Sequence, residues 1–215
     1  MIRRLTDALL HEEREVVWSL ATEHLRATGS RLAVFADILH PAQERLAELW
    51  YSSRVGHADE ARAAGAVLAI TRRLPPTPVP APVPHGSGCI LTALPTERHT
   101  LGLEMLRAAL EDDGWAVDMV LGDELEGLLD HVGAFRPRFV GVTAGWLEAA
   151  SPMAALIEAV HGLGVPVLVG GQAFNRAPDL WRRLEADGWG PDLRVALVLA
   201  RRALRGGGTP SAGAA

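Results

Sequence analysis

The chain has 215 residues, of which 48% are hydrophobic, with a net charge of −5 and a pI of about 5.9. It is therefore long enough for one large domain or two small ones with a real core. The acidic balance and the lack of a Lys/Arg cluster argue against a nucleic-acid-binding protein. The one cysteine, Cys89, excludes an intrachain disulfide framework and a Cys-rich zinc site.

The sequence predicts neither a membrane span nor a signal peptide. No apolar run reaches the length that crosses a bilayer. The charged residues near the N-terminus are not followed by the apolar stretch of a signal peptide. We therefore expect a cytoplasmic protein that contacts no membrane.

Residues 1–73 predict a small antiparallel bundle of four helices. Apolar side chains recur there with a period of about 3.6 residues. The four stretches with this period are 2–25, 32–39, 46–50 and 59–70. Short connections between amphipathic helices favour antiparallel neighbours, so we assign 1–73 as one helical domain.

Prolines dominate residues 74–86 and predict a linker. Six prolines fall within ten positions, which rules out a helix or a central strand. Such a run favours the polyproline II conformation, at roughly 3 Å per residue. At the other end of the chain, residues 206–215 are rich in Gly and Ala, and we expect them to be disordered.

Residues 87–205 alternate between strand and helix patterns. Apolar strand runs occupy 89–94, 116–121, 138–143 and 165–169. Helical runs occupy 100–113, 124–135, 149–162, 178–185 and 192–204. This alternation predicts an α/β domain with a Rossmann-like, flavodoxin-like doubly wound parallel sheet and helices on both faces.

Candidate site residues follow three of the predicted strands. His99 follows the first strand, Thr143 and Gly145 the third, and Gly170–Gly171 the fourth. Ligands of such sheets bind outside the carboxyl ends of the strands, so we expect these loops to open onto one edge. Without side chains, Gly170–Gly171 would let a ligand approach the backbone. The nucleotide and acyl-transfer motifs G-x-G-x-x-G, Walker A and G-x-S-x-G do not occur.

The loop after the first strand has the pattern of a metal ligand. His99 can bind a metal through one ring nitrogen, while Glu97, two residues before it, takes the proton on the other. Gly102 would let the backbone come close to a bulky group. Taken singly, such a His is more often an ordinary surface residue and a Gly-Gly pair an ordinary turn. Their combination in the loops of one sheet favours a binding site.

This combination resembles the cobalamin-binding domains of methionine synthase, corrinoid methyl carriers and light-responsive regulators of the CarH type. Their pattern is D-x-H-x-x-G, a Ser-containing loop some forty residues later, then Gly-Gly; here Glu97 replaces Asp, and Thr143 follows His99 by 44 positions. The resemblance implies that His99 is the lower axial ligand of cobalt. It implies that Thr143 bonds the buried base of the cobalamin tail, which lies between the first and fourth strands. Residues 186–192 look like the closing strand and the start of the last helix.

The N-terminal half resembles the helical cap of the same proteins. Residues 40–51 look like the cap helix that presents a Trp, here Trp50, to the upper face of the corrin. Ten residues later the family has Glu-His, and this chain has Glu60–Ala61. The resemblance implies that Trp50 and Glu60 pack around the 5′-deoxyadenosyl group, so that adenosylcobalamin is the expected cofactor.

The chain departs from the family pattern at the upper cobalt position. Tyr51 stands where a cap His can bind cobalt after photolysis, which leaves His57 as a weak candidate for that ligand. The space above the corrin would suit a second chromophore, although Cys89, in a predicted buried strand, could not tether one. Trp146, next to the Thr143 loop, is a further candidate for contact with ligand or cap.

The resemblance leaves three functions open, none of them an enzyme in its own right. The leading interpretation is a light or ligand sensor whose cap responds to photolysis of the cobalt–carbon bond. Such a sensor would act through a homo-oligomer or a protein signalling partner, since the chain lacks a basic helix-turn-helix. The alternatives are a corrinoid methyl carrier of a methyltransferase system and a cobalamin storage or delivery protein. Trp50 is bulkier than a methyl carrier needs, and an adenosyl ribose explains Glu60 better.

Overall fold

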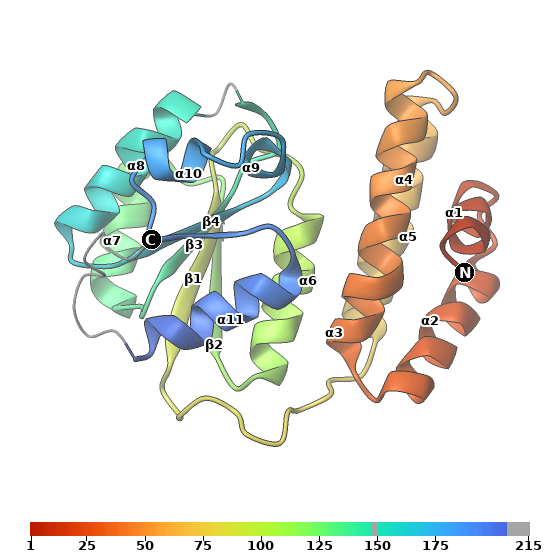
Figure 1. The fold of residues 1–215 in the computed structure, drawn as a ribbon, viewed down its shortest axis with the longest axis horizontal. Coiled ribbons are helices and arrows are strands. Elements are labelled where there is room, and N and C mark those ends of the chain that lie inside the picture. The colour runs from red at the N-terminus through yellow and green to blue at the C-terminus, as the bar shows by residue number, and fades with distance from the viewer. Residues whose placement is uncertain (148–149, 206–215) are drawn as a thin grey trace. The chain divides into compact units, whose positions relative to one another are not determined.

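The computed structural model describes residues 1–147 and 150–205, and the chain divides between Thr77 and Pro78 into two compact units (Figure 1). The tail expected to be disordered, 206–215, lies outside the described residues. Among the residues described, no helix combines the length and the apolar character needed to cross a membrane.

The first unit consists of helices, as predicted, but the breaks between them differ. Its elements are α1 (Ile2–Leu10), α2 (Arg14–Thr28), α3 (Arg31–Val34), the π-helical turn η1 (Phe35–Leu39), α4 (His40–Tyr51) and α5 (His57–Arg73). The single helix expected over 2–25 is wrong, because Glu12 takes a left-handed φ of 59° between α1 and α2. The fully buried side chains of Leu5, Phe35 and Leu46 form part of the core of this unit.

The break expected near residue 40 is also wrong, since α3, η1 and α4 follow one another without interruption. Pro41 has no N–H and would ordinarily end a helix. Here it stands in the first turn of α4, directly after the π-helical turn. The N–H of His40 reaches back five residues to the carbonyl of Phe35, so the helix absorbs the proline by local widening.

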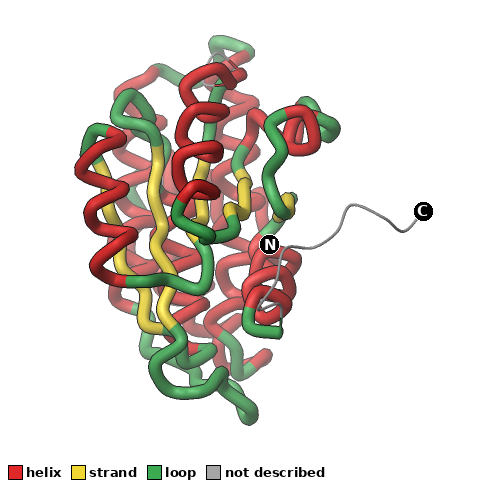
Figure 2. Tube along the Cα trace, turned by 90° about the vertical axis from the view of Figure 1, so that its left-hand side faces the viewer, coloured by secondary structure: helices red, strands yellow, loops and turns green. Residues whose placement is uncertain are grey.

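The second unit is a five-stranded parallel sheet with helices on both faces, which confirms the predicted fold class (Figures 1 and 2). The strands are β1 (Gly88–Ala93), β2 (Ala116–Leu121), β3 (Val140–Thr143), β4 (Val167–Gly170) and β5 (Gly188–Gly190), in the order β2-β1-β3-β4-β5. The helices are α6 (Leu101–Asp112), α7 (Leu125–Phe135), α8 (Ala150–Gly162), α9 (Gln172–Arg176), α10 (Leu180–Arg183) and α11 (Leu193–Ala203).

Each face of the sheet has its own buried cluster. Beneath α6 and α11, the side chains of Leu91, Leu110 and Phe139 are buried. On the opposite face, Ile157 and Phe174 belong to the cluster beneath α7, α8 and α9. Because both faces are covered, the central strands β1, β3 and β4 are apolar runs, and this explains why they stand out in the sequence.

The strands and helices largely match the predicted ranges. β5 lies within the segment 186–192 that resembles a closing strand. The helix predicted over 178–185 is shorter, and α9 precedes it without having been predicted. Five residues are too few for helical periodicity to be visible in a sequence.

Part of the Pro-rich segment is packed onto the second unit rather than free. In residues 79–83, the docked segment, the N–H groups of Val79 and Val83 donate to the carbonyls of Asp112 and Asp113. Val83 is buried beside Trp115. Pro80 and Pro82 alternate with these residues and face solvent. Because proline has no N–H, no backbone donor is left unpaired at these two positions.

Arg201 of α11 holds the docked segment in place. Its guanidinium makes ion-pair contacts with the buried carboxylate of Asp113 and donates to the carbonyl of Ala81 at 2.9 Å. This pairing raises the pKa of Arg201. Trp115 donates to the same Asp113 carboxylate at 3.3 Å. The buried carboxylate therefore connects Trp115 with α11, and Arg201 extends this connection to the docked segment.

A second arginine anchors the chain where it leaves α5. Arg31 is 7% exposed. Its side chain donates to the carbonyl of Leu74 at 3.3 Å, and its backbone N–H donates to the Thr77 hydroxyl at 2.8 Å. Thr77 is therefore held to the first unit and Val79 to the second, with Pro78 between them.

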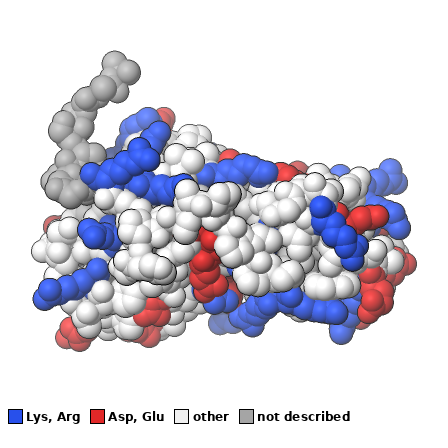
Figure 3. Space-filling view, turned by 90° about the horizontal axis from the view of Figure 1, so that it is seen from below, with Lys and Arg blue, Asp and Glu red and all other residues white. Residues whose placement is uncertain are grey.

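Side chains of both charges occur on the face drawn in Figure 3, in places next to one another and elsewhere with uncharged surface between them. All 21 basic residues of the chain are arginine.

We predict that Arg201→Met loosens the docked segment. Met keeps the aliphatic packing but leaves the Asp113 carboxylate without its guanidinium, a loss of roughly 1–3 kcal/mol. The amides of Val79 and Val83 should then exchange with deuterium faster, as measured by NMR. Arg202→Met, at the next, exposed position of α11, is the matched control and should leave both amides protected. Unchanged protection in Arg201→Met would show that Arg201 does not hold the docked segment.

Candidate functional site

The strand register brings the predicted loops together. Ala93 pairs with Thr143, Thr143 with Gly170, and Gly170 with Gly190, so four strands end in one row. The loops that carry His99, Gly145 and Gly171 leave from this row. The sequence-based expectation that they share one edge of the sheet agrees with this register.

The sheet order does not place the first and fourth strands side by side. The resemblance implied a slot between the first and fourth strands, but β3 lies between β1 and β4. From β1 the chain crosses through α6 to β2 on one side, and from β3 it crosses through α8 to β4 on the other. Strand order therefore reverses between β1 and β3, which is where such sheets open a crevice for ligands.

The carboxylate of Glu97 connects the loops after β1 and β3. Its Oε1 accepts the backbone N–H of His99 at 2.7 Å and lies 2.8 Å from His99 Nδ1. Its Oε2 accepts the backbone N–H of Gly145 at 2.6 Å. The Glu97 side chain is 4% exposed and that of His99 58%. With its proton on Nδ1, a neutral imidazole has Nε2 available for a metal.

The surroundings keep this carboxylate charged. Burial raises the pKa of Glu97, but hydrogen bonds from the backbone of His99 and Gly145 and from the His99 ring outweigh it, so the pKa lies below its usual value. Glu97 is therefore ionised at neutral pH. Hydrogen bonds to an ionised acceptor are stronger than neutral ones, which favours a fixed loop geometry.

The glycines of the site differ in how much space a side chain would have. A Cβ on Gly171 would lie 2.4 Å from the carbonyl oxygen of Ala144 and 2.7 Å from Thr143 Oγ1, and its φ is +97°. A Cβ on Gly145 would lie 2.9 Å from Glu97 Oε2. The protein itself therefore requires both glycines, whatever binds nearby. Around Gly102, by contrast, a Cβ would meet nothing within 4 Å, so this position is open to a ligand.

The protein donors near His99 suit a metal that brings its own ligands. Nowhere in the described ranges do three or more His, Cys, Asp or Glu side chains gather closely enough to hold a metal ion. One exposed imidazole, oriented by a carboxylate, offers a single axial ligand. A metal chelated by a macrocycle fits this donor set, because the protein then needs to supply only one ligand.

Comparison with known families decides the class of ligand. Residues 88–198, more than half of the chain, match the B12 binding domain family. The chain belongs to the B12-binding domain family. No curated protein matches it.

Three solved structures share the fold of this B12-binding domain protein. A cobalamin-binding protein from Desulfitobacterium hafniense DCB-2 is 17% identical, with a TM-score of 0.51 and coverage of 94% of this chain and 98% of that one. The monomethylamine corrinoid protein of Methanosarcina barkeri is 12% identical, with a TM-score of 0.70 and coverage of 92% and 95%. A chain of the methanol:cobalamin methyltransferase complex of the same organism is 17% identical, with a TM-score of 0.52 and coverage of 97% and 80%.

The residues that the resemblance assigned to a helical cap lie where α4 meets α5. Trp50 and Tyr51 end α4, and their ring centroids are 4.9 Å apart. His57 is the first residue of α5, exposed, with its ring centroid 6.0 Å from that of Trp50. Glu60 follows in the first turn of α5 and is half-buried. The structure therefore brings Trp50 and His57 together at one end of the helical unit.

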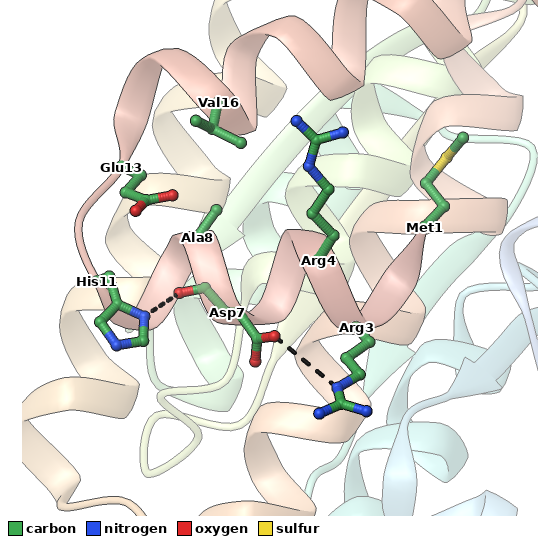
Figure 4. A pocket seen from close by; sticks show the side chains of 8 residues that line it. All are labelled: Met1, Arg3, Arg4, Asp7, Ala8, His11, Glu13 and Val16. Carbon is green, nitrogen blue, oxygen red and sulfur yellow. Dashed lines mark hydrogen bonds and ion pairs between the residues drawn. The ribbon is translucent and has the colours of Figure 1, made fainter.

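Two other features bear on the predictions. Cys89 is fully buried in β1, and burial raises the pKa of its thiol to about 12, so it is not a reactive anchor for a chromophore. A pocket of about 440 Å³ lies on the first unit, where Arg3 contacts Asp7 at 4.0 Å (Figure 4). None of the predicted site residues lines that pocket.

Sequence analysis missed one residue at the edge of the sheet. Asn175 in α9 donates to the carbonyl of Pro191 at 3.1 Å and accepts the indole N–H of Trp189 at 3.3 Å. It thereby joins α9 to the loop after β5. Its position just after the Gly170–Gly171 pair was the only signal available in the sequence.

We predict that Glu97→Gln disturbs the site despite its similar shape. Gln has one carbonyl oxygen, so its NH₂ group would face an N–H donor, of either His99 or Gly145. Leaving a buried donor unpaired costs roughly 1–3 kcal/mol. The ring ¹⁵N shifts of His99 and the amide shift of Gly145 should both change in the NMR spectrum. Glu126→Gln, an exposed change in α7, should alter neither, and unchanged shifts in Glu97→Gln would show that Glu97 does not hold the loops.

Proposed function

We propose that this protein binds cobalamin with His99 as the lower axial ligand of cobalt. The observation that carries the proposal is the Glu97 carboxylate that fixes His99 Nδ1 in a chain of the B12-binding domain family. A carboxylate on the far nitrogen sets the tautomer of a ligand imidazole and raises its basicity. The exposed ring and the open space at Gly102 leave room for a macrocycle.

Thr143 and the glycines would accommodate the cobalamin tail. Thr143 is half-buried at the end of β3, next to β1, where the strand order reverses. Its hydroxyl would bond the base of the tail. Gly170 and Gly171, both half-buried, present no side chain to a ligand at the neighbouring end of β4, and Gly145 keeps the Glu97 carboxylate in place.

We predict that His99→Ala loses the protein-derived axial nitrogen. The electron paramagnetic resonance spectrum of bound cob(II)alamin should lack protein-nitrogen coupling, and the absorption spectrum should move towards the base-off form. Loss of such a ligand should weaken binding at least as much as loss of its orienting partner, about 10–100-fold. His57→Ala should retain the coupling; retention in His99→Ala would rule out His99.

We further propose that the protein is a sensor of the upper ligand of cobalt, with adenosylcobalamin as its cofactor. Alkylcobalamins carry a cobalt–carbon bond that light breaks, and this is the chemistry that the cofactor supplies. Trp50 offers an aromatic face for the adenine, and Glu60 an acceptor for the ribose hydroxyls. His57, whose ring centroid lies 6.0 Å from that of Trp50, would replace the missing cap His. A conformational change in the helical unit would then be transmitted to a second copy of the chain or to a protein partner.

A corrinoid methyl carrier is the alternative function. The likeness to the monomethylamine corrinoid protein covers 92% of this chain, so it extends into both units. A methyl carrier would use the same His99 and would hand its methyl group to a partner enzyme. A methyl carrier should not bind adenosylcobalamin more tightly than methylcobalamin.

We predict that the sensor prefers adenosylcobalamin to methylcobalamin. Stacking of a base on an aromatic side chain contributes about 1–3 kcal/mol, or a factor of roughly 5–150 in affinity. Titration should show this preference in the wild type and in Trp50→Phe, and its loss in Trp50→Ala. Illumination should change the elution volume of the adenosyl-loaded protein. Equal affinities and an unchanged elution volume would favour the methyl carrier.

A further inference from the structure

Trp146 contacts the ring of the candidate axial ligand. The ring centroids of Trp146 and His99 are 5.8 Å apart, with an interplanar angle of 69°, which is an edge-to-face arrangement. Aromatic pairs favour this geometry and gain free energy beyond simple burial. Trp146 is 38% exposed, so it is not explained as a core residue.

The position of Trp146 is tied to that of His99 through the chain. Gly145, the residue before Trp146, donates to Glu97 Oε2 at 2.6 Å, and Glu97 Oε1 lies 2.8 Å from His99 Nδ1. One carboxylate thus holds both the imidazole and the start of the segment that carries the indole. Glu97 fixes one nitrogen of the ring, and Trp146 packs against the ring itself.

We propose that Trp146 is a positioning residue for His99: its indole restricts rotation of the imidazole, so that the nitrogen not bonded to Glu97 stays directed at the cobalt of cobalamin. This inference rests on the proposed role of His99 as axial ligand. The hydrogen bond to Glu97 alone permits the ring to swing about the line through Nδ1. The Trp146 indole beside the ring removes that freedom before the ligand binds, which lowers the entropic cost of binding.

The first test uses the ligand-free protein. In the wild type the indole ring current should shift the ring protons of His99, which are assigned by their disappearance in His99→Ala. Trp146→Leu should remove this shift and Trp146→Phe should keep much of it. Leu147→Ala, the neighbouring exposed apolar residue, is the matched control and should leave the His99 signals unchanged. Unchanged His99 signals in Trp146→Leu would overturn the contact and the proposal.

The second test measures cobalamin affinity in a double-mutant cycle with aquacobalamin as the probe. Loss of an aromatic contact should make Trp146→Leu bind roughly 2- to 13-fold more weakly, with rescue by Trp146→Phe. A residue that acts through His99 should have no effect once His99 is Ala. The same loss in the His99→Ala background would mean that Trp146 contacts cobalamin directly, and would overturn the positioning role.

The cycle also separates this inference from the proposed function. If His99→Ala binds cobalamin as tightly as the wild type, the axial assignment is wrong and the positioning role falls with it. If His99→Ala binds weakly but Trp146→Leu binds normally, the axial assignment stands and the positioning role alone is overturned.

Discussion

A single buried carboxylate sets the geometry at the edge of the sheet. Glu97 is almost without solvent and carries a charge, so it must be surrounded by donors. Those donors come from two segments 48 residues apart, the loop after β1 and the loop after β3. The family pattern has Asp here, and the longer side chain of Glu suits a carboxylate that reaches across to the backbone of Gly145. The two loops cannot move independently while this charge is satisfied.

Local patterns predicted the elements of the second unit well, but not how they meet. The buried strands are recognisable because both faces of the sheet are covered, and His99, Thr143 and Gly170 were placed at strand ends for that reason. The order of the strands was not readable, since it depends on which side each helix crosses. The tail slot was therefore predicted between β1 and β4, two strands that β3 separates. Contacts such as that of Arg201 with Asp113, 88 residues apart, leave no local signal.

In the helical unit, the expected break between the stretches 32–39 and 46–50 was wrong. A π-helical turn carries the chain through Pro41 without interruption. Trp50 and Glu60 were nevertheless placed on successive helices, because the turn between them is marked by small and polar residues. Whether a helix ends at a proline depends on whether the preceding turn can widen, and that depends on packing rather than on the residues beside the proline.

The two arginine anchors have a mechanical consequence. Thr77 is held by Arg31 and Val79 by Asp112, so only two peptide units, of about 3.8 Å each, separate two fixed points. The ring of Pro78 removes further freedom between them. The connection between the two units is therefore short and has few accessible conformations. It acts as a stiff spacer and not as a flexible tether.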